Sequence, residues 1–130
     1  MSPLNRCALT LRPRRPMLDW IRPFASVLEV QEICQHESLY LLPCFEDQAQ
    51  AWQRLEQVSH RVFQAELELW CRDPACWPED LSFSAFQRWF AVAFHPLVED
   101  LGEEPLRHLT LDPAFSLRVR AALGQPTAEG

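Results

Sequence analysis

The sequence predicts a small α+β domain in which a two- to three-stranded sheet is covered by two long helices. Residues 5–12 and 38–45 have strand character, whereas residues 47–71 and 82–101 have the apolar periodicity of helices. More than half of the aromatic residues lie between residues 63 and 94, which places the main core there. A chain of 130 residues fits one domain.

The first strand is predicted from an alternation along residues 5–12. Cys7, Leu9 and Leu11 share one face of an extended chain, which is typical of a half-buried strand. The second strand, residues 38–45, is densely apolar, and Pro43 places its end at an edge or an exit. The connection between them is long enough for parallel pairing, and antiparallel pairing stays open.

Shorter helices are expected between these two strands. Residues 16–21 begin with a proline, which suits the first turn of a helix. Residues 27–35 also have a helical pattern, with a strand as the alternative.

Residues 47–71 have the strongest helical pattern of the chain. Asp47 can cap the N-terminus, and Gln50 stands three residues later, as in a capping box. Glu66 falls within the apolar face, where an ionised carboxylate needs a partner or a raised pKa. Glu66 is therefore a candidate general acid or base. The alternative is a buried acid satisfied by an arginine, an indole N–H or a backbone amide.

A second long helix is predicted over residues 82–101, capped by Ser82. Its apolar stripe consists of Phe83, Phe86, Phe90, Ala93, Leu97 and Leu101. Pro96 predicts a kink or a break near His95, because proline removes a helical hydrogen bond. His95 and the nearby Asp100 are candidates for proton transfer. The alternative for His95 is a bond to a carbonyl that the proline leaves free.

The loop between the two long helices, residues 72–81, is expected to be rigid because it contains Pro74 and Pro78. Trp70, Trp77 and Trp89 are candidates for an aromatic binding pocket. Aromatic residues at helical spacing more often belong to a core, so Trp77 in the loop is the one expected to be partly exposed.

The predicted compact domain spans residues 1–102, because apolar residues become sparse after Gly102. Residues 103–130 form a C-terminal extension, with a short helix at about 113–123 and a disordered end.

Charge and cysteine content exclude several classes of function. Residues 46–104 carry twelve acidic residues against four arginines, which argues against a nucleic-acid partner. The chain has no lysine, so Schiff-base chemistry is excluded. Its five cysteines predict free thiols in a reducing cytoplasm, and their spacing matches no standard zinc site. No metal, cofactor or membrane span is expected.

Residues 63–101 contain a recognisable pattern: an acidic helix ending in E-L-x-x-W, a W-P loop, F-x-x-W-F, a histidine and a terminal D-L. The matching positions are Glu66, Leu67, Trp70, Trp77, Pro78, Phe86, Trp89, Phe90, His95, Asp100 and Leu101. With N-terminal matches at residues 5–7, 18–20 and 40–43, the chain resembles a family of small uncharacterised bacterial proteins over about residues 4–102. The resemblance implies no established activity. Pro96 departs from the pattern and puts an unbroken last helix in doubt.

The sequence favours a non-enzymatic cytosolic protein that acts by binding another protein, with homo-oligomerisation left open. The alternative is a small-molecule binder or enzyme that uses Glu66, His95 and Asp100 in a cleft between the long helices. The candidate binding residues are Glu66, Trp70, Trp77, Trp89, His95 and Asp100, and no catalytic residue is assigned.

Overall fold

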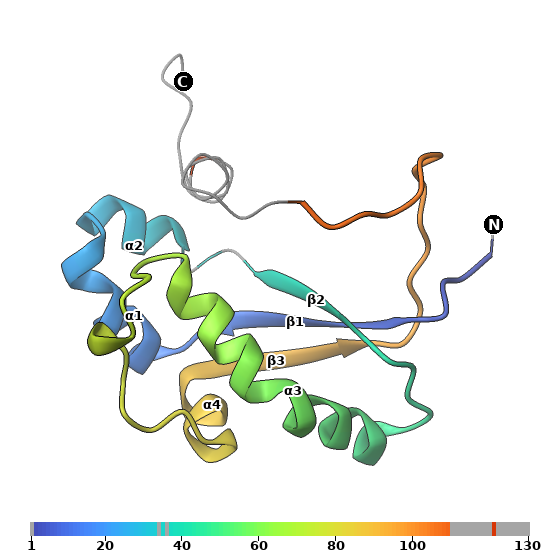
Figure 1. Cartoon of the computed structure of the whole chain (residues 1–130), viewed down its shortest axis with the longest axis horizontal. Helices are drawn as coiled ribbons and strands as arrows, with labels where there is room; N and C mark the ends of the chain where they lie inside the picture. The colour runs from blue at the N-terminus through green and yellow to red at the C-terminus, as the bar shows by residue number, and fades with distance from the viewer. Residues whose placement is uncertain (1, 34, 36, 110–120, 122–130) are drawn as a thin grey trace.

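The computed structural model describes residues 2–33, 35, 37–109 and 121. Within them, three strands form one antiparallel sheet in the order β2-β1-β3; they are β1 (Cys7–Pro13), β2 (Ser38–Leu42) and β3 (Phe90–His95). Figure 1 shows α3 (Gln48–Glu68) lying across this sheet, with α1 (Arg15–Ile21) and α2 (Val27–Ile33) grouped near the end of β1. The predicted α+β class and single small domain are confirmed. The open choice between parallel and antiparallel pairing resolves as antiparallel.

The central strand is β1 (Cys7–Pro13), and it forms where the alternation predicts it. Its neighbour β2 (Ser38–Leu42) ends just before Pro43, which cannot donate to the ladder. Cys7 is paired with Leu42, and Leu11 with Ser38. Facing residues of an antiparallel pair point to the same side of the sheet. Leu9, Leu11 and Leu42 belong to the core cluster, so the odd-numbered residues of β1 face the helices.

The third strand, β3 (Phe90–His95), corrects the second long helix. Helix α4 (Phe83–Trp89) begins as predicted, with the Ser82 hydroxyl accepting a bond from Ala85 N at 3.2 Å. The predicted continuation to residue 101 is wrong, and Pro96 follows a strand instead of kinking a helix. Residues 90–95 also alternate large and small, with an aromatic or β-branched residue at every second position, as strands prefer. Pairing with β1 favours this strand-like alternation over the helical spacing of the same residues.

Helix α3 (Gln48–Glu68) is the one long helix in the described residues. Its N-terminus is capped as expected, since the Asp47 carboxylate accepts a bond from Gln50 N at 2.8 Å. The Gln50 side chain accepts from Glu46 N, one residue earlier than a standard capping box.

The remaining elements are short and connect the sheet to α3. They are α1 (Arg15–Ile21), the 3₁₀ turn η1 (Arg22–Phe24), α2 (Val27–Ile33) and the 3₁₀ turn η2 (Pro74–Cys76). The helices predicted near residues 16–21 and 27–35 are both present. The loop expected over residues 72–81 contains only the turn η2.

The core lies between the sheet and the helices and centres on Phe63. Its ring is fully buried and lies 5.9 Å from Phe86, 5.5 Å from Phe90 and 5.3 Å from Trp89 between ring centres. Such spacings are typical of favourable aromatic pairs. The aromatic run is therefore core, contributed by α3, α4 and β3.

After β3 the chain continues without helix or strand to residue 109, apart from a bridge between Pro3 and Glu99. Leu4 N also donates to Val98 O at 2.7 Å, which ties the start of this stretch to the N-terminus. The short helix predicted at about 113–123 and the predicted disordered end lie outside the described residues, except for Ala121. The domain boundary at residue 102 stays a prediction.

Candidate functional site

Glu66 lies on the buried face of α3 and is bonded to the edge strand β2. Its carboxylate accepts a hydrogen bond from the Ser38 hydroxyl at 3.1 Å and another from the Tyr40 hydroxyl at 2.5 Å. Only 8% of the residue is exposed. The alternation along β2 turns Ser38 and Tyr40 towards α3 and leaves Leu39 and Leu41 on the other face. Glu66 is thus a buried carboxylate whose two oxygens both accept hydrogen bonds from hydroxyls.

The surroundings of Glu66 raise the pKa of two side chains, Glu66 itself and Tyr40. Burial raises the pKa of Glu66, and the bonds from Tyr40 and Ser38 partly offset this by stabilising the carboxylate. Burial, the charge of Glu66 and the bond to it all raise the pKa of Tyr40, so the phenol keeps its proton and acts as donor. The cluster is suited to holding β2 against α3, because each hydroxyl proton has an acceptor.

His95 lies on the opposite face of the sheet from Glu66. It is the last residue of β3 and is exposed, and its Nε2 lies 3.1 Å from the Thr10 hydroxyl on β1. The preceding residue, Phe94, points to the helix side and packs against Trp52 at 5.2 Å between ring centres. The structure therefore separates Glu66 from His95 by the sheet.

Asp100 is exposed and accepts a hydrogen bond from Gly102 N at 2.8 Å, which closes a local turn. It stands in the stretch after β3, whereas Glu66 is in the core beneath β2. Among the described residues, Glu66, His95 and Asp100 thus do not share a cleft between two long helices.

The three tryptophans proposed for a pocket are all half-buried and pack against the core. Trp89 contacts Phe63. The Trp77 indole donates to Cys71 O at 2.8 Å, which holds the loop after α3. Trp77 is partly exposed, as expected for its place in the loop. Trp70, the third of these tryptophans, also packs against the core.

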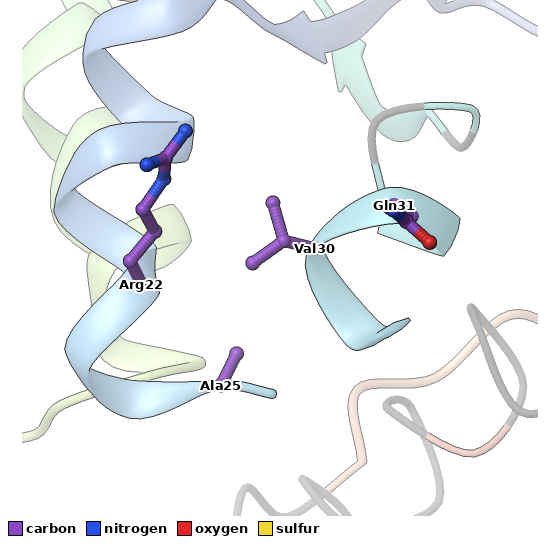
Figure 2. Close-up of a pocket in the computed structure, with 4 residues that line it drawn as sticks. All are labelled: Arg22, Ala25, Val30 and Gln31. Atoms are coloured by element: carbon purple, nitrogen blue, oxygen red, sulfur yellow. The ribbon is translucent and has the colours of Figure 1, made fainter. Parts of the chain in front are cut away.

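The structure contains a pocket of about 330 Å³ that involves none of the predicted site residues. Arg22, Ala25, Val30 and Gln31 line it, between the end of α1 and α2. Figure 2 shows Ala25 and Val30 facing the space beside Arg22, while Gln31 lies on the far side of the α2 ribbon. The Arg22 guanidinium is paired with Asp19 at 3.5 Å. Its charge is thus already partly neutralised.

A metal centre is not formed by the described residues, in which no three histidine, cysteine or acidic side chains gather. Cys71 precedes η2 and Cys76 is its last residue, and no third ligand gathers with them among the described residues. Cys34 and His36 lie outside the described residues.

Four of the six exposed large apolar side chains in the described residues lie in one stretch, of which the sequence analysis named only Leu97 and Leu101, as part of a helical stripe. Residues 97–109, here called the acidic leucine segment, carry four leucines that are 60–79% exposed: Leu97, Leu101, Leu106 and Leu109. Acidic residues stand between them: Glu99, Asp100, Glu103 and Glu104. Figure 1 shows this stretch in orange, leaving β3 beside the N-terminal residues. The available signal was the recurrence of leucine among acids beyond Leu101, where Pro105 interrupts any continuation of the helical stripe predicted up to that residue.

Comparisons of the chain with protein-family models, curated proteins and solved structures find no match. The resemblance to small bacterial proteins therefore stays a prediction. In the part of the chain that the structure describes, no helix has both the length and the apolar character needed to cross a membrane.

Proposed function

We propose that the protein acts by binding a partner protein through the acidic leucine segment. The observation that carries this proposal is the exposure of its four leucines, up to 79% at Leu101, in a stretch without helix or strand. Large apolar side chains that gather on a surface mark sites of interaction. Burying each leucine in a partner contributes about 1.5–3 kcal/mol, so two or three of them can anchor a complex.

The charges of the segment define the chemistry of the partner. Four acids lie within residues 97–104, and the first arginine follows only at Arg107. We expect the partner to present an apolar groove rimmed by arginine or lysine, which complements the leucines and acids of the segment. The acids of the segment would repel competing proteins with acidic surfaces. The bond from Leu4 N to Val98 O ties the start of the segment, next to Leu97, to the N-terminal residues. The cytosolic setting predicted from the cysteines is part of the same proposal.

The test compares three forms of the full chain immobilised against a lysate of the source cells: wild type, L101S/L106S and L39S. Leu39 is a matched control, because it is a leucine of β2 that is 60% exposed outside the segment. We expect one or more proteins to be retained by wild type and L39S and to fall at least tenfold with L101S/L106S. Added salt should weaken the retention, because screening reduces charge attraction.

Two results would overturn the proposal. The first is an identical set of retained proteins for wild type and L101S/L106S. The second is no retained protein together with a metabolite that raises the melting temperature of the full chain, which would favour the small-molecule alternative. Light scattering on the purified protein adds a third outcome. If wild type self-associates and L101S/L106S does not, the occupant is a second copy and not a different partner.

A further inference from the structure

The pocket between α1 and α2 combines one positive charge with an apolar wall. Its volume of about 330 Å³ falls within the range of small-molecule sites. Ala25 and Val30 supply apolar surface, and both also pack against the edge of the core. Arg22 supplies the charge, and Figure 2 shows its side chain across the space from Val30. This combination is suited to a ligand that has a charged end and an apolar end.

The turn between the two helices is held by local hydrogen bonds. Ala25 N donates to Arg22 O at 3.4 Å, which ends η1. Ser26 then starts α2 with a capping box. Glu29 N donates to the Ser26 hydroxyl at 3.1 Å, and Ser26 N donates to the Glu29 carboxylate at 3.0 Å. Because Val30 directly follows this box, its position relative to Arg22 is set by the protein itself before a ligand arrives.

The charge of Arg22 is only partly used within the protein. Its Nη2 lies 3.5 Å from Asp19 Oδ1, which is longer than the roughly 2.7–2.9 Å of a strong ion-pair hydrogen bond. The same oxygen accepts a bond from Arg15 Nε at 3.2 Å, so it serves two guanidinium groups. Among the described residues, Asp19 is the one acidic partner of Arg22. The two acids of α2 do not line the pocket, and the carboxylate of Glu29 is engaged by Ser26 N. Arg22 therefore retains N–H donors for a second anion.

We propose that this pocket binds a small aliphatic carboxylate, with the carboxylate on the Arg22 guanidinium and the aliphatic chain against Ala25 and Val30. A guanidinium can hold a carboxylate through two parallel hydrogen bonds, which fixes the orientation of the ligand. The volume sets the size of the ligand. Liquid water occupies about 30 Å³ per molecule, so the pocket holds about ten non-hydrogen atoms, as in a carboxylate of about six to eight carbons.

The test titrates hexanoate into the isotope-labelled full chain and follows the backbone amide signals by NMR. We expect saturable shifts centred on Ala25 and Val30. The alcohol hexanol has the same chain length without the charge, and it should bind several-fold more weakly at the same place. Moderate salt should weaken the binding of hexanoate and have little effect on hexanol, because screening acts on the ion pair.

Two variants separate the charged contact from the apolar one. Arg22→Gln should weaken hexanoate binding about fivefold, the effect of one partly exposed ion pair, and leave hexanol binding unchanged. Val30→Thr replaces a methyl by a hydroxyl and should weaken the binding of both ligands about fourfold. Arg15→Gln is the matched control. Arg15 also pairs with Asp19 but does not line the pocket, so the hexanoate affinity should stay within about twofold of wild type.

Three results would overturn the proposal. They are amide shifts that do not saturate, shifts centred on the acidic leucine segment instead of the pocket, and an equal loss of hexanoate and hexanol binding in Arg22→Gln. Equal weakening of hexanoate binding by Arg22→Gln and Arg15→Gln would also contradict it, since the ligand would then respond only to net charge. The partner proposal is tested by retained proteins and by leucine variants outside this pocket, so the two proposals fail independently.

Discussion

At the scale of single residues, Glu66 shows how an acid is tolerated in an aromatic core. Its two oxygens are held by Ser38 and Tyr40, neither of which carries a charge. The sequence pattern located Glu66 on the buried face. The expected partners were an arginine, an indole N–H or a backbone amide, whereas the observed partners are two hydroxyls. The β2 alternation contained the missing signal, because it places two hydroxyls on the face that meets α3.

We predict that Glu66 makes stability fall as pH rises. Burial raises the pKa of Glu66 in the folded protein above the usual 4.5. At a pH between 4.5 and this raised pKa, the folded protein binds more protons than the unfolded chain. The free energy of unfolding then decreases with pH through that window, by up to about 1.4 kcal/mol per pH unit, and levels off above the folded pKa. Glu66→Gln should lack this decrease, and urea unfolding from pH 4.5 to 8 measures it.

The matched control for this experiment is Glu56→Gln, an exposed position on the same helix. It should show the same pH dependence as wild type. Curves for Glu66→Gln and wild type that stay parallel over the whole range would contradict a raised pKa at Glu66.

At the scale of elements, α4 and β3 show two periodicities competing in one stretch. Phe83, Phe86 and Phe90 follow a helical spacing, whereas Phe90, Val92 and Phe94 follow a strand spacing. The helical spacing prevails only until Trp89, where the chain becomes extended and pairs with β1. Local pattern alone does not decide such a case, because the free edge of β1 supplies backbone bonds that a helix prediction does not count.

We predict that the N-terminal cap of α4 contributes measurably to the stability of the protein, although α4 is a short helix. Ser82→Ala removes the acceptor for Ala85 N and should cost about 1 kcal/mol of unfolding free energy. Ser84→Ala is the control on the same helix. Its hydroxyl bonds only the exposed Arg88 side chain among the described contacts, so its cost should stay within about 0.5 kcal/mol. Chemical denaturation of both variants gives the comparison, and equal costs would argue against the cap.

At the scale of the whole molecule, stability is concentrated in the aromatic cluster around Phe63. We predict that Phe63→Ala costs about 3–5 kcal/mol, because it removes a fully buried ring that contacts α4 and β3 at once. Leu97→Ala, at a side chain that is 65% exposed, should change stability by less than about 0.5 kcal/mol. Urea unfolding of both variants measures these values, and a loss below about 1 kcal/mol for Phe63→Ala would show that the core lies elsewhere.

Features that depend on neighbours in the sequence could be predicted, and those that depend on distant pairing could not. The strand β1, the cap of α3 and the burial of Glu66 all follow from patterns within one segment. The strand β3 and the hydroxyl partners of Glu66 arise only when the sheet assembles. The acidic leucine segment was not recognised for a different reason: Leu97 and Leu101 were predicted to lie on the buried stripe of a helix, since exposure of leucine contradicts its usual preference for the interior.

The central position of β1 has a consequence for how the chain folds during synthesis. This strand is made first, yet its two ladders need residues 38–42 and 90–95. The sheet therefore stays incomplete until residue 95 has left the ribosome, and β1 exposes an unpaired edge throughout that time. Such distant pairing slows folding and favours association with other nascent chains. A chain shortened at its N-terminus beyond residue 7 would lose the strand that both ladders share.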